Sequence, residues 1–121
     1  MKEEIRERFL EFASNIVILV RAMKNTFEGR HVFGQLFRAG TSAGANYEES
    51  HSAESVKDFI HKRGIVEKEL RESLFWLELT KRAKIISENT NIDDMICENS
   101  ELLKIIAKSI ITIKQRQTSD K

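Results

Sequence analysis

The chain contains no proline in its 121 residues, and it contains only five glycines. Strand-rich folds need turn residues at short intervals, yet no Asn-Gly or Asp-Gly pair is present to close a tight hairpin. Proline breaks the interior of a helix, so its absence leaves long helices uninterrupted. The abundant Glu, Lys, Leu, Ile, Ala and Arg favour helices as well. The sequence therefore predicts an all-α protein.

Cysteine and long apolar runs are scarce too. Cys97 is the only cysteine, so no disulfide can form within one chain. The longest apolar run, Ile16 to Val20, is far shorter than the roughly 18 residues that a membrane span needs. Acids at Glu3, Glu4 and Glu7 distinguish the amino terminus from a secretory signal or a transit peptide. We therefore expect a cytoplasmic protein that does not enter a membrane.

An excess of one sign of charge is also lacking. Lys and Arg number 20 and Asp and Glu number 19, which gives a formal net charge of +1. No general field therefore draws the chain toward nucleic acid or acidic lipid. Hydrophobic residues make up 40% and charged residues 32%, the balance of an ordinary globular protein. At this length there is room for one hydrophobic core, so we expect residues 1–121 to form a single domain.

Apolar residues recur at steps of three and four along most of the chain, which is the spacing of one face of a helix. The pattern predicts four helices at about residues 2–24, 30–49, 55–87 and 93–117. Ser55, with Asp58 three residues later, is the predicted N-cap of the third helix. Because the connections are short, we expect an antiparallel, up-down-up-down four-helix bundle.

The second predicted helix has a middle, Arg38 to Asn46, that is made almost entirely of small residues. Gly40 and Gly44 within it each cost the helix about 1 kcal/mol relative to alanine. A close approach by a neighbouring backbone would offset that cost, because small residues let two helices pack tightly. We therefore expect the substitution Gly44→Leu to force neighbouring helices apart.

The same segment, Gly40 to Gly44, matches the Gly-x-Ser-x-Gly motif that presents the nucleophilic serine in many hydrolases. That motif needs a strand before the serine and a helix after it. Here the preceding residues, Gln35 to Ala39, are predicted to be helical, so Ser42 is not expected to be a nucleophile. No nucleophile, base and orienting residue converge elsewhere in the sequence. We assign no catalytic residue and do not expect an enzyme.

Candidate metal ligands are scattered. The three histidines are His31, His51 and His61. None belongs to the Glu-x-x-His pair that di-iron bundles use, so solvated surface histidines are the better interpretation. Glu67, Glu69 and Glu72 stand close together, but on a helix we expect them to pair with basic side chains. No metal site and no cofactor are predicted.

Basic residues gather toward the end of the fourth predicted helix, with no acid between Leu102 and Gln117. They are Lys104, Lys108, Lys114 and Arg116. Two interpretations are open: the cations offset the negative end of the helix dipole, or they contact nucleic acid. A second basic group would lie at the opposite pole of an antiparallel bundle, so the two groups would not merge in one subunit. That group is Lys81, Arg82 and Lys84.

One segment, Gln35 to Glu49, resembles the four-helix-bundle proteins encoded in intervening sequences of bacterial 23S ribosomal RNA genes. The positions that carry the family's first pattern are Gln35, Arg38, Ser42, Asn46 and Glu49. A second block is similar as well and contains Glu69, Glu72 and Trp76. The resemblance extends from about Leu10 to Arg116.

The resemblance implies a cytoplasmic four-helix bundle that assembles into a ring, a homopentamer, with a largely unassigned molecular role. A related branch, the accessory proteins of diversity-generating retroelements, binds a reverse transcriptase and nucleic acid through a strongly basic surface. This chain departs from that branch because its net charge is only +1. Apolar residues off the predicted inner stripes agree with an oligomer interface. They are Leu19, Phe75, Leu79 and Ile105.

Residues and resemblance together predict a non-enzymatic, homo-oligomeric interaction module, whose further partner is a protein or a nucleoprotein. The alternative is an RNA- or DNA-binding accessory factor that acts with a nucleic-acid enzyme such as a reverse transcriptase. The polar residues of the two family blocks are expected to meet in a partly buried network that fixes helix register. Its central members would be Arg38, Asn46, Glu69 and Glu72.

Overall fold

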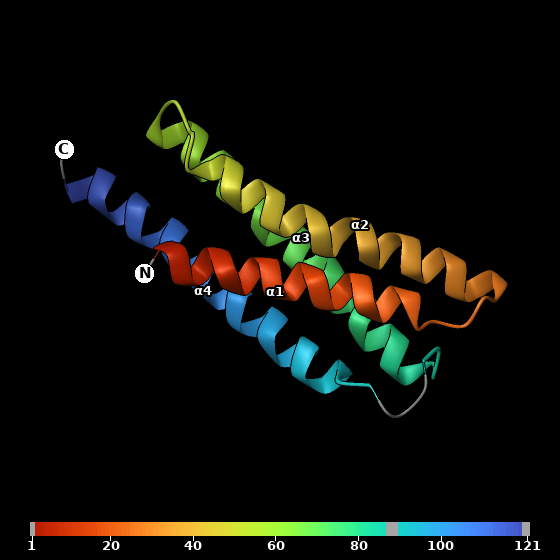
Figure 1. The fold of residues 1–121 in the computed structure, drawn as a ribbon. Coiled ribbons are helices and arrows are strands. Elements are labelled where there is room, and N and C mark those ends of the chain that lie inside the picture. The colour runs from red at the N-terminus through yellow and green to blue at the C-terminus, as the bar shows by residue number, and fades with distance from the viewer. Residues whose placement is uncertain (1, 87–89, 120–121) are drawn as a thin grey trace.

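The computed structural model describes residues 2–86 and 90–119, and this part of the chain forms four helices. They are α1 (Lys2–Arg21), α2 (Phe27–Ser50), α3 (Val56–Arg82) and α4 (Ile92–Ser119). Each helix packs against the next one along the chain, and α1 also meets α4 along a short stretch (Figure 1). The predicted all-α, up-down-up-down bundle is confirmed. None of the described helices combines the length and apolar character needed to cross a membrane.

Capping residues set the starts of the two central helices. The Ser55 hydroxyl accepts the backbone N–H of Asp58 at 3.0 Å, so the predicted N-cap of α3 is present. α2 begins at Phe27 rather than near Arg30, because the Thr26 hydroxyl accepts the backbone N–H of Gly29 at 3.0 Å. Threonine is a common N-cap residue. The sequence prediction had nevertheless placed Thr26 in the connection between the first two helices.

α3 ends at Arg82, five residues before the predicted limit of 87, and residue 87 itself lies outside the described part. Lys84 follows with a φ of 56°, in the left-handed region. Its N–H donates to the Lys81 carbonyl at 3.2 Å, and the Ile85 N–H donates to the Thr80 carbonyl at 3.1 Å. These two bonds form a Schellman motif, which ends a helix and turns the next residue inward. Ile85 is accordingly buried.

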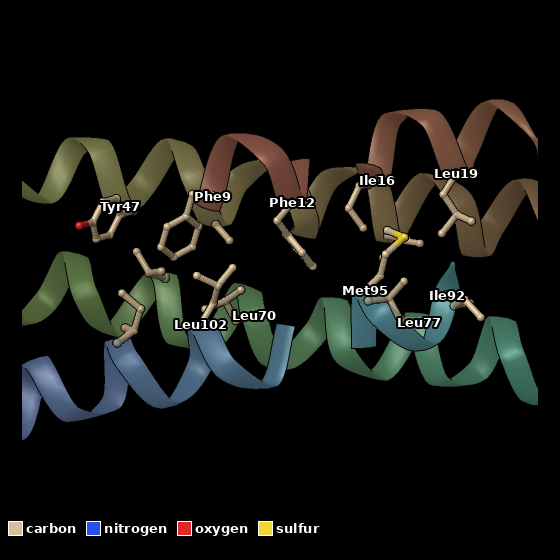
Figure 2. Close-up of a cluster of buried hydrophobic side chains, with 14 of the residues drawn as sticks. Phe9, Phe12, Ile16, Leu19, Tyr47, Leu70, Leu77, Ile92, Met95 and Leu102 are labelled. Atoms are coloured by element: carbon tan, nitrogen blue, oxygen red, sulfur yellow. The ribbon is translucent and has the colours of Figure 1, made fainter. Parts of the chain in front are cut away.

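The core lies along the axis of the bundle, where all four helices contribute side chains (Figure 2). The largest fully buried apolar residues are Phe12, Ile16, Leu36, Leu70, Leu77, Leu102 and Ile106. Leu19, which the sequence analysis assigned to an oligomer interface, belongs to this core and is only 4% exposed. That assignment was wrong, because the apolar stripe of α1 is wide enough to include it.

The small residues of α2 let α1 come close at one point. A Cβ atom added to Gly40 would lie 2.9 Å from Cγ1 of the buried Ile16, which is too close for an ordinary contact. A Cβ added to Gly44 would meet Cβ of Phe9 at 3.5 Å, which is an ordinary contact. The expected close approach is therefore tightest at Gly40 rather than at Gly44.

Candidate functional site

An arginine and two carboxylates join α2 to α3. Arg38 donates from Nη1 to Glu69 Oε2 at 3.0 Å and from Nη2 to Glu72 Oε2. Glu69 is almost fully buried, whereas Arg38 is about half exposed. The hydrogen bond to Glu72, together with the negative charge of both carboxylates, raises the pKa of Arg38 above its ordinary value. One guanidinium thus holds two carboxylates that are three residues apart on α3.

Asn46 does not join this cluster. Its side-chain amide donates to the Ser42 carbonyl at 2.9 Å, one turn earlier in α2. A short amide on a helix reaches its own backbone more easily than a residue on another helix, and the sequence prediction overlooked this competition. The predicted single network is therefore smaller than expected: it contains Arg38, Glu69 and Glu72.

The other residues of the two family blocks lie apart from the arginine cluster. Glu49 lies 3.9 Å from Lys62 Nζ, across the connection between α2 and α3. Trp76 is half-buried and makes edge-to-face contacts with His31 and Phe75, with ring centroids 5.8 and 5.1 Å apart. Gln35 and Ser42 are half-buried on α2. Glu49 and Trp76 therefore make two further contacts between α2 and α3, apart from the arginine cluster.

A second polar site, which the sequence analysis missed, surrounds Arg63 on α3. Arg63 is 7% exposed and donates from Nε to the Ser50 hydroxyl at 2.9 Å and from Nη1 to the Ser109 hydroxyl at 2.8 Å. Its guanidinium carbon lies 4.8 Å from the centre of the Tyr47 ring and 4.4 Å from that of Phe59. One side chain therefore joins α2, α3 and α4.

The two serines are oriented to accept from Arg63. Ser50 donates its own proton to the Tyr47 carbonyl at 2.6 Å, and Ser109 donates to the Ile106 carbonyl at 2.7 Å. Each hydroxyl has one proton, so its lone pairs are left for the guanidinium. Burial lowers the pKa of Arg63. Among the described residues no carboxylate pairs with Arg63, so hydroxyls and aromatic faces alone offset the cost of burying its charge.

A signal for Arg63 was present in the sequence. The apolar stripe of α3 runs through Phe59, Val66 and Leu70, and Arg63 occupies the inward position between the first two. A cation at such a position must find hydrogen-bond partners inside the bundle. The serine partners come from distant parts of the chain, so the sequence pattern alone did not identify them.

Two of the four predicted basic residues of α4 line the same groove. Lys108 and Arg116 line a groove of about 370 Å³ between α3 and α4, together with Phe59, Ser109 and Ile113. Lys104 instead lies 3.6 Å from Glu101 on its own helix, and Lys114 lies beside the exposed Ile111. At the other pole of the bundle, Lys81 pairs with Asp93 at 2.5 Å.

The described residues give no support to the catalytic or metal alternatives. Ser42 lies in the middle of α2, and no strand precedes it in the described chain, so the context of a nucleophilic serine is missing. No three His, Cys, Asp or Glu side chains within residues 2–86 and 90–119 are placed to hold a metal ion. The polar sites of this bundle are helix-joining clusters.

Comparison with known proteins places this chain in a family. Residues 1–108 match the family described as the 23S rRNA-intervening sequence protein. The chain belongs to this family. A crystal structure of a protein of unknown function from the S23 ribosomal protein family of Bacteroides thetaiotaomicron is similar, with 34% identity and a TM-score of 0.81. The similarity covers 91% of this chain and 98% of that chain. Among curated proteins none matches the chain.

Proposed function

We propose that this member of the 23S rRNA-intervening sequence protein family is a non-enzymatic, cytoplasmic interaction module that assembles as a homopentamer. The observation that carries the proposal is the number of large apolar side chains that the folded monomer leaves in water. They are Leu10, Ile18, Phe27, Phe37, Val56, Phe75 and Ile111, which are 40% to 83% exposed. Covering such side chains with another protein chain would release the water around them, which favours association.

Of the apolar residues that the sequence analysis assigned to an interface, Phe75 stays exposed over 60% of its surface and is available to a further protein partner. Leu79 and Ile105, assigned with it, are half-buried. The non-enzymatic part of the proposal is supported by Glu69 and Glu72, since both carboxylates are engaged by Arg38 rather than available as a general base.

Light scattering coupled to size-exclusion chromatography at micromolar concentration tests the assembly. A homopentamer has five times the monomer mass of 14.0 kDa. A monomer under these conditions would contradict the proposed assembly and remove much of the argument for an interaction role.

The second candidate function is an RNA- or DNA-binding accessory factor that acts with a nucleic-acid enzyme such as a reverse transcriptase. The observation that favours it is the groove lined by Lys108 and Arg116, where the hydroxyl-bearing Thr112 stands beside the cations. Such a mixture can contact phosphate oxygens. A net charge of only +1 per chain ranks this function second, because non-specific affinity for nucleic acid depends on cationic charge.

A further inference from the structure

The surface between α1 and α2 holds a partly open apolar pocket of about 300 Å³. Its apolar walls come from Phe9, Leu10, Ala13, Gly44, Ala45 and Tyr47. Leu10 is 46% exposed, and Ala45 is exposed as well. Water in contact with such walls is released when an apolar side chain enters, which favours occupation of the pocket. A branched aliphatic side chain is small enough to enter a pocket of this volume.

Carboxylates outnumber cations at the charged edge of this pocket. Arg6 and Glu48 line it and form an ion pair, with Arg6 Nε 2.9 Å from Glu48 Oε1. Glu7, which is outside the pocket lining, lies 3.7 Å from Arg6 Nη1 on the same helix. One guanidinium therefore stands between two carboxylates, so negative charge exceeds positive charge beside the pocket.

Ile111 on α4 has the complementary properties. It is 56% exposed, and Lys108 and Lys114 stand three residues to either side of it. No acid follows Glu101 in α4, so Ile111 is an apolar side chain in a basic surround. Phe75 has comparable exposure, but the residues three positions to either side of it are the acids Glu72 and Glu78, so its surroundings are not basic.

Ile111 does not meet the pocket of its own chain. Arg8 on α1 pairs with Glu98 on α4 at 2.5 Å, which fixes the antiparallel register of these two helices. In that register, the start of α1 at Lys2 lies near the level of Lys104, about seven residues before Ile111. The C-terminal end of α4 accordingly extends past the start of α1 (Figure 1). Ile111 is therefore available to another molecule.

We propose that Ile111 of one copy inserts into the α1–α2 pocket of a second copy, with Lys108 and Lys114 facing the carboxylates of Glu48, in the pocket lining, and Glu7, beside it. The inference rests on the proposed homo-oligomer and names the two surfaces that meet. Because different patches of the two copies are joined, the contact is heterologous and repeats from copy to copy until a ring closes. The match to the family ends at residue 108, before Ile111. We therefore infer this contact for the present chain and not for the family as a whole.

Two substitutions at exposed positions test the contact from its two sides. Ile111→Glu removes the inserted side chain, and Ala45→Trp fills the pocket. Each variant alone is expected to run as a 14.0 kDa monomer with an unchanged circular dichroism spectrum. Phe75→Glu is the matched control, because it removes an equally exposed apolar residue from α3, and it should keep the wild-type mass.

Mixing the two variants gives the sharper result. The Ile111→Glu variant retains a working pocket, and the Ala45→Trp variant retains a working Ile111, so one contact per pair can form. An equimolar mixture is expected to contain a 1:1 heterodimer, 2 × 14.0 kDa = 28.0 kDa, by light scattering. Monomers only, or homodimers of either variant, would overturn the pairing of Ile111 with the pocket.

The wild-type mass separates this inference from the proposed function. If the wild type is an oligomer and Ile111→Glu leaves its mass unchanged, the interface lies elsewhere, and the inference fails while the homo-oligomer stands. If the wild type is a monomer, both fail. Loss of the oligomer in Phe75→Glu with its retention in Ile111→Glu would move the interface to α3.

Discussion

Arg63 on α3 donates a hydrogen bond to the Ser109 hydroxyl on α4 across 2.8 Å, in a part of the bundle where its charge meets no carboxylate of the described chain. Removing the acceptor leaves a buried guanidinium N–H unsatisfied, which costs about 1–3 kcal/mol. Ser109→Ala should therefore lower the free energy of unfolding by that amount in urea titrations. Ser14→Ala, at an exposed position on α1, should change it by less than about 0.5 kcal/mol.

The same pair permits a second comparison. Arg63→Met removes both the charge and the donors while keeping a long apolar side chain, so it should destabilise the fold no more than Ser109→Ala does. In the Arg63→Met background, Ser109→Ala should be close to neutral, because the hydroxyl no longer has a donor to accept from. Equal effects of Ser109→Ala in both backgrounds would show that the hydrogen bond does not contribute to stability.

The arginine cluster between α2 and α3 gives a prediction on coupling. Arg38 and Glu72 are hydrogen-bonded, and Arg38 is about half exposed, so solvent weakens the interaction. A double-mutant cycle with Arg38→Met and Glu72→Gln should still give a coupling energy above about 0.5 kcal/mol. The control cycle is Glu67–Arg71, a looser pair at 4.0 Å within α3, for which a smaller coupling is expected. Additive effects in the first cycle would remove the cluster as a determinant of helix register.

Three glycines of α2 differ in the space around them and should respond differently to alanine. Apart from its chain neighbours and the backbone of its own helix, nothing lies within 4 Å of a Cβ added to Gly34, so Gly34→Ala should raise the free energy of unfolding by about 0.5–1 kcal/mol through helix propensity. Gly40→Ala would press on Ile16, and overpacking of about 1–3 kcal/mol should outweigh that gain. Gly44→Ala should lie between the two. A Gly40→Ala protein as stable as Gly34→Ala would disprove the close approach of α1 at this point.

The start of α3 gives a prediction on pH. Asp58 accepts the backbone N–H of Glu54 at 3.1 Å and lies 3.4 Å from Lys62 Nζ. The bond from Glu54, followed by the charge of Lys62, lowers the pKa of Asp58 below its ordinary value of 3.8. Because the pKa is lower in the folded state, the ionised carboxylate stabilises the fold above pH 3.8, and this contribution is lost as the pH falls through the folded-state pKa. The difference in stability between wild type and Asp58→Asn should therefore shrink in acid.

The four helices could be predicted because each depends on a local, periodic pattern of apolar residues. The cap at Ser55 was also visible, since serine and aspartate stand at the right spacing. The end of α3 was not, because Lys84 occupies a left-handed position where glycine is the usual residue. The pattern continued through Ile85 and Ile86, which are buried after the chain has left the helix.

A polar site could be predicted where its residues belong to the family pattern, and not where its residues lie far apart in the chain. Arg38, Glu69 and Glu72 were singled out together because they belong to the two family blocks. Asn46 was included wrongly, because a bond to its own backbone is not visible in a pattern of residue types. The serine partners of Arg63 are 13 and 46 residues away along the chain, so packing alone brings them to the guanidinium.

The last prediction concerns nucleic acid. A ring of five copies repeats the groove of Lys108 and Arg116, yet its formal charge is only 5 × (+1) = +5. We therefore expect weak, non-specific RNA binding at most, with a Kd of about 10⁻⁴ to 10⁻⁶ M that rises steeply with salt, because such binding comes from counterion release.

Fluorescence anisotropy with a structured RNA at two salt concentrations measures both the affinity and its dependence on salt. Arg116→Glu should weaken any binding while leaving the proposed contact of Lys108 with a neighbouring copy in place, whereas Lys81→Glu, at the opposite pole, serves as the matched control. Nanomolar binding at physiological salt that is lost in Arg116→Glu would reverse the ranking of the two functions, because so tight a complex requires contacts beyond the charge of this surface. Absence of binding at low salt would leave protein partners, including further copies of this chain, as the targets of the exposed apolar residues.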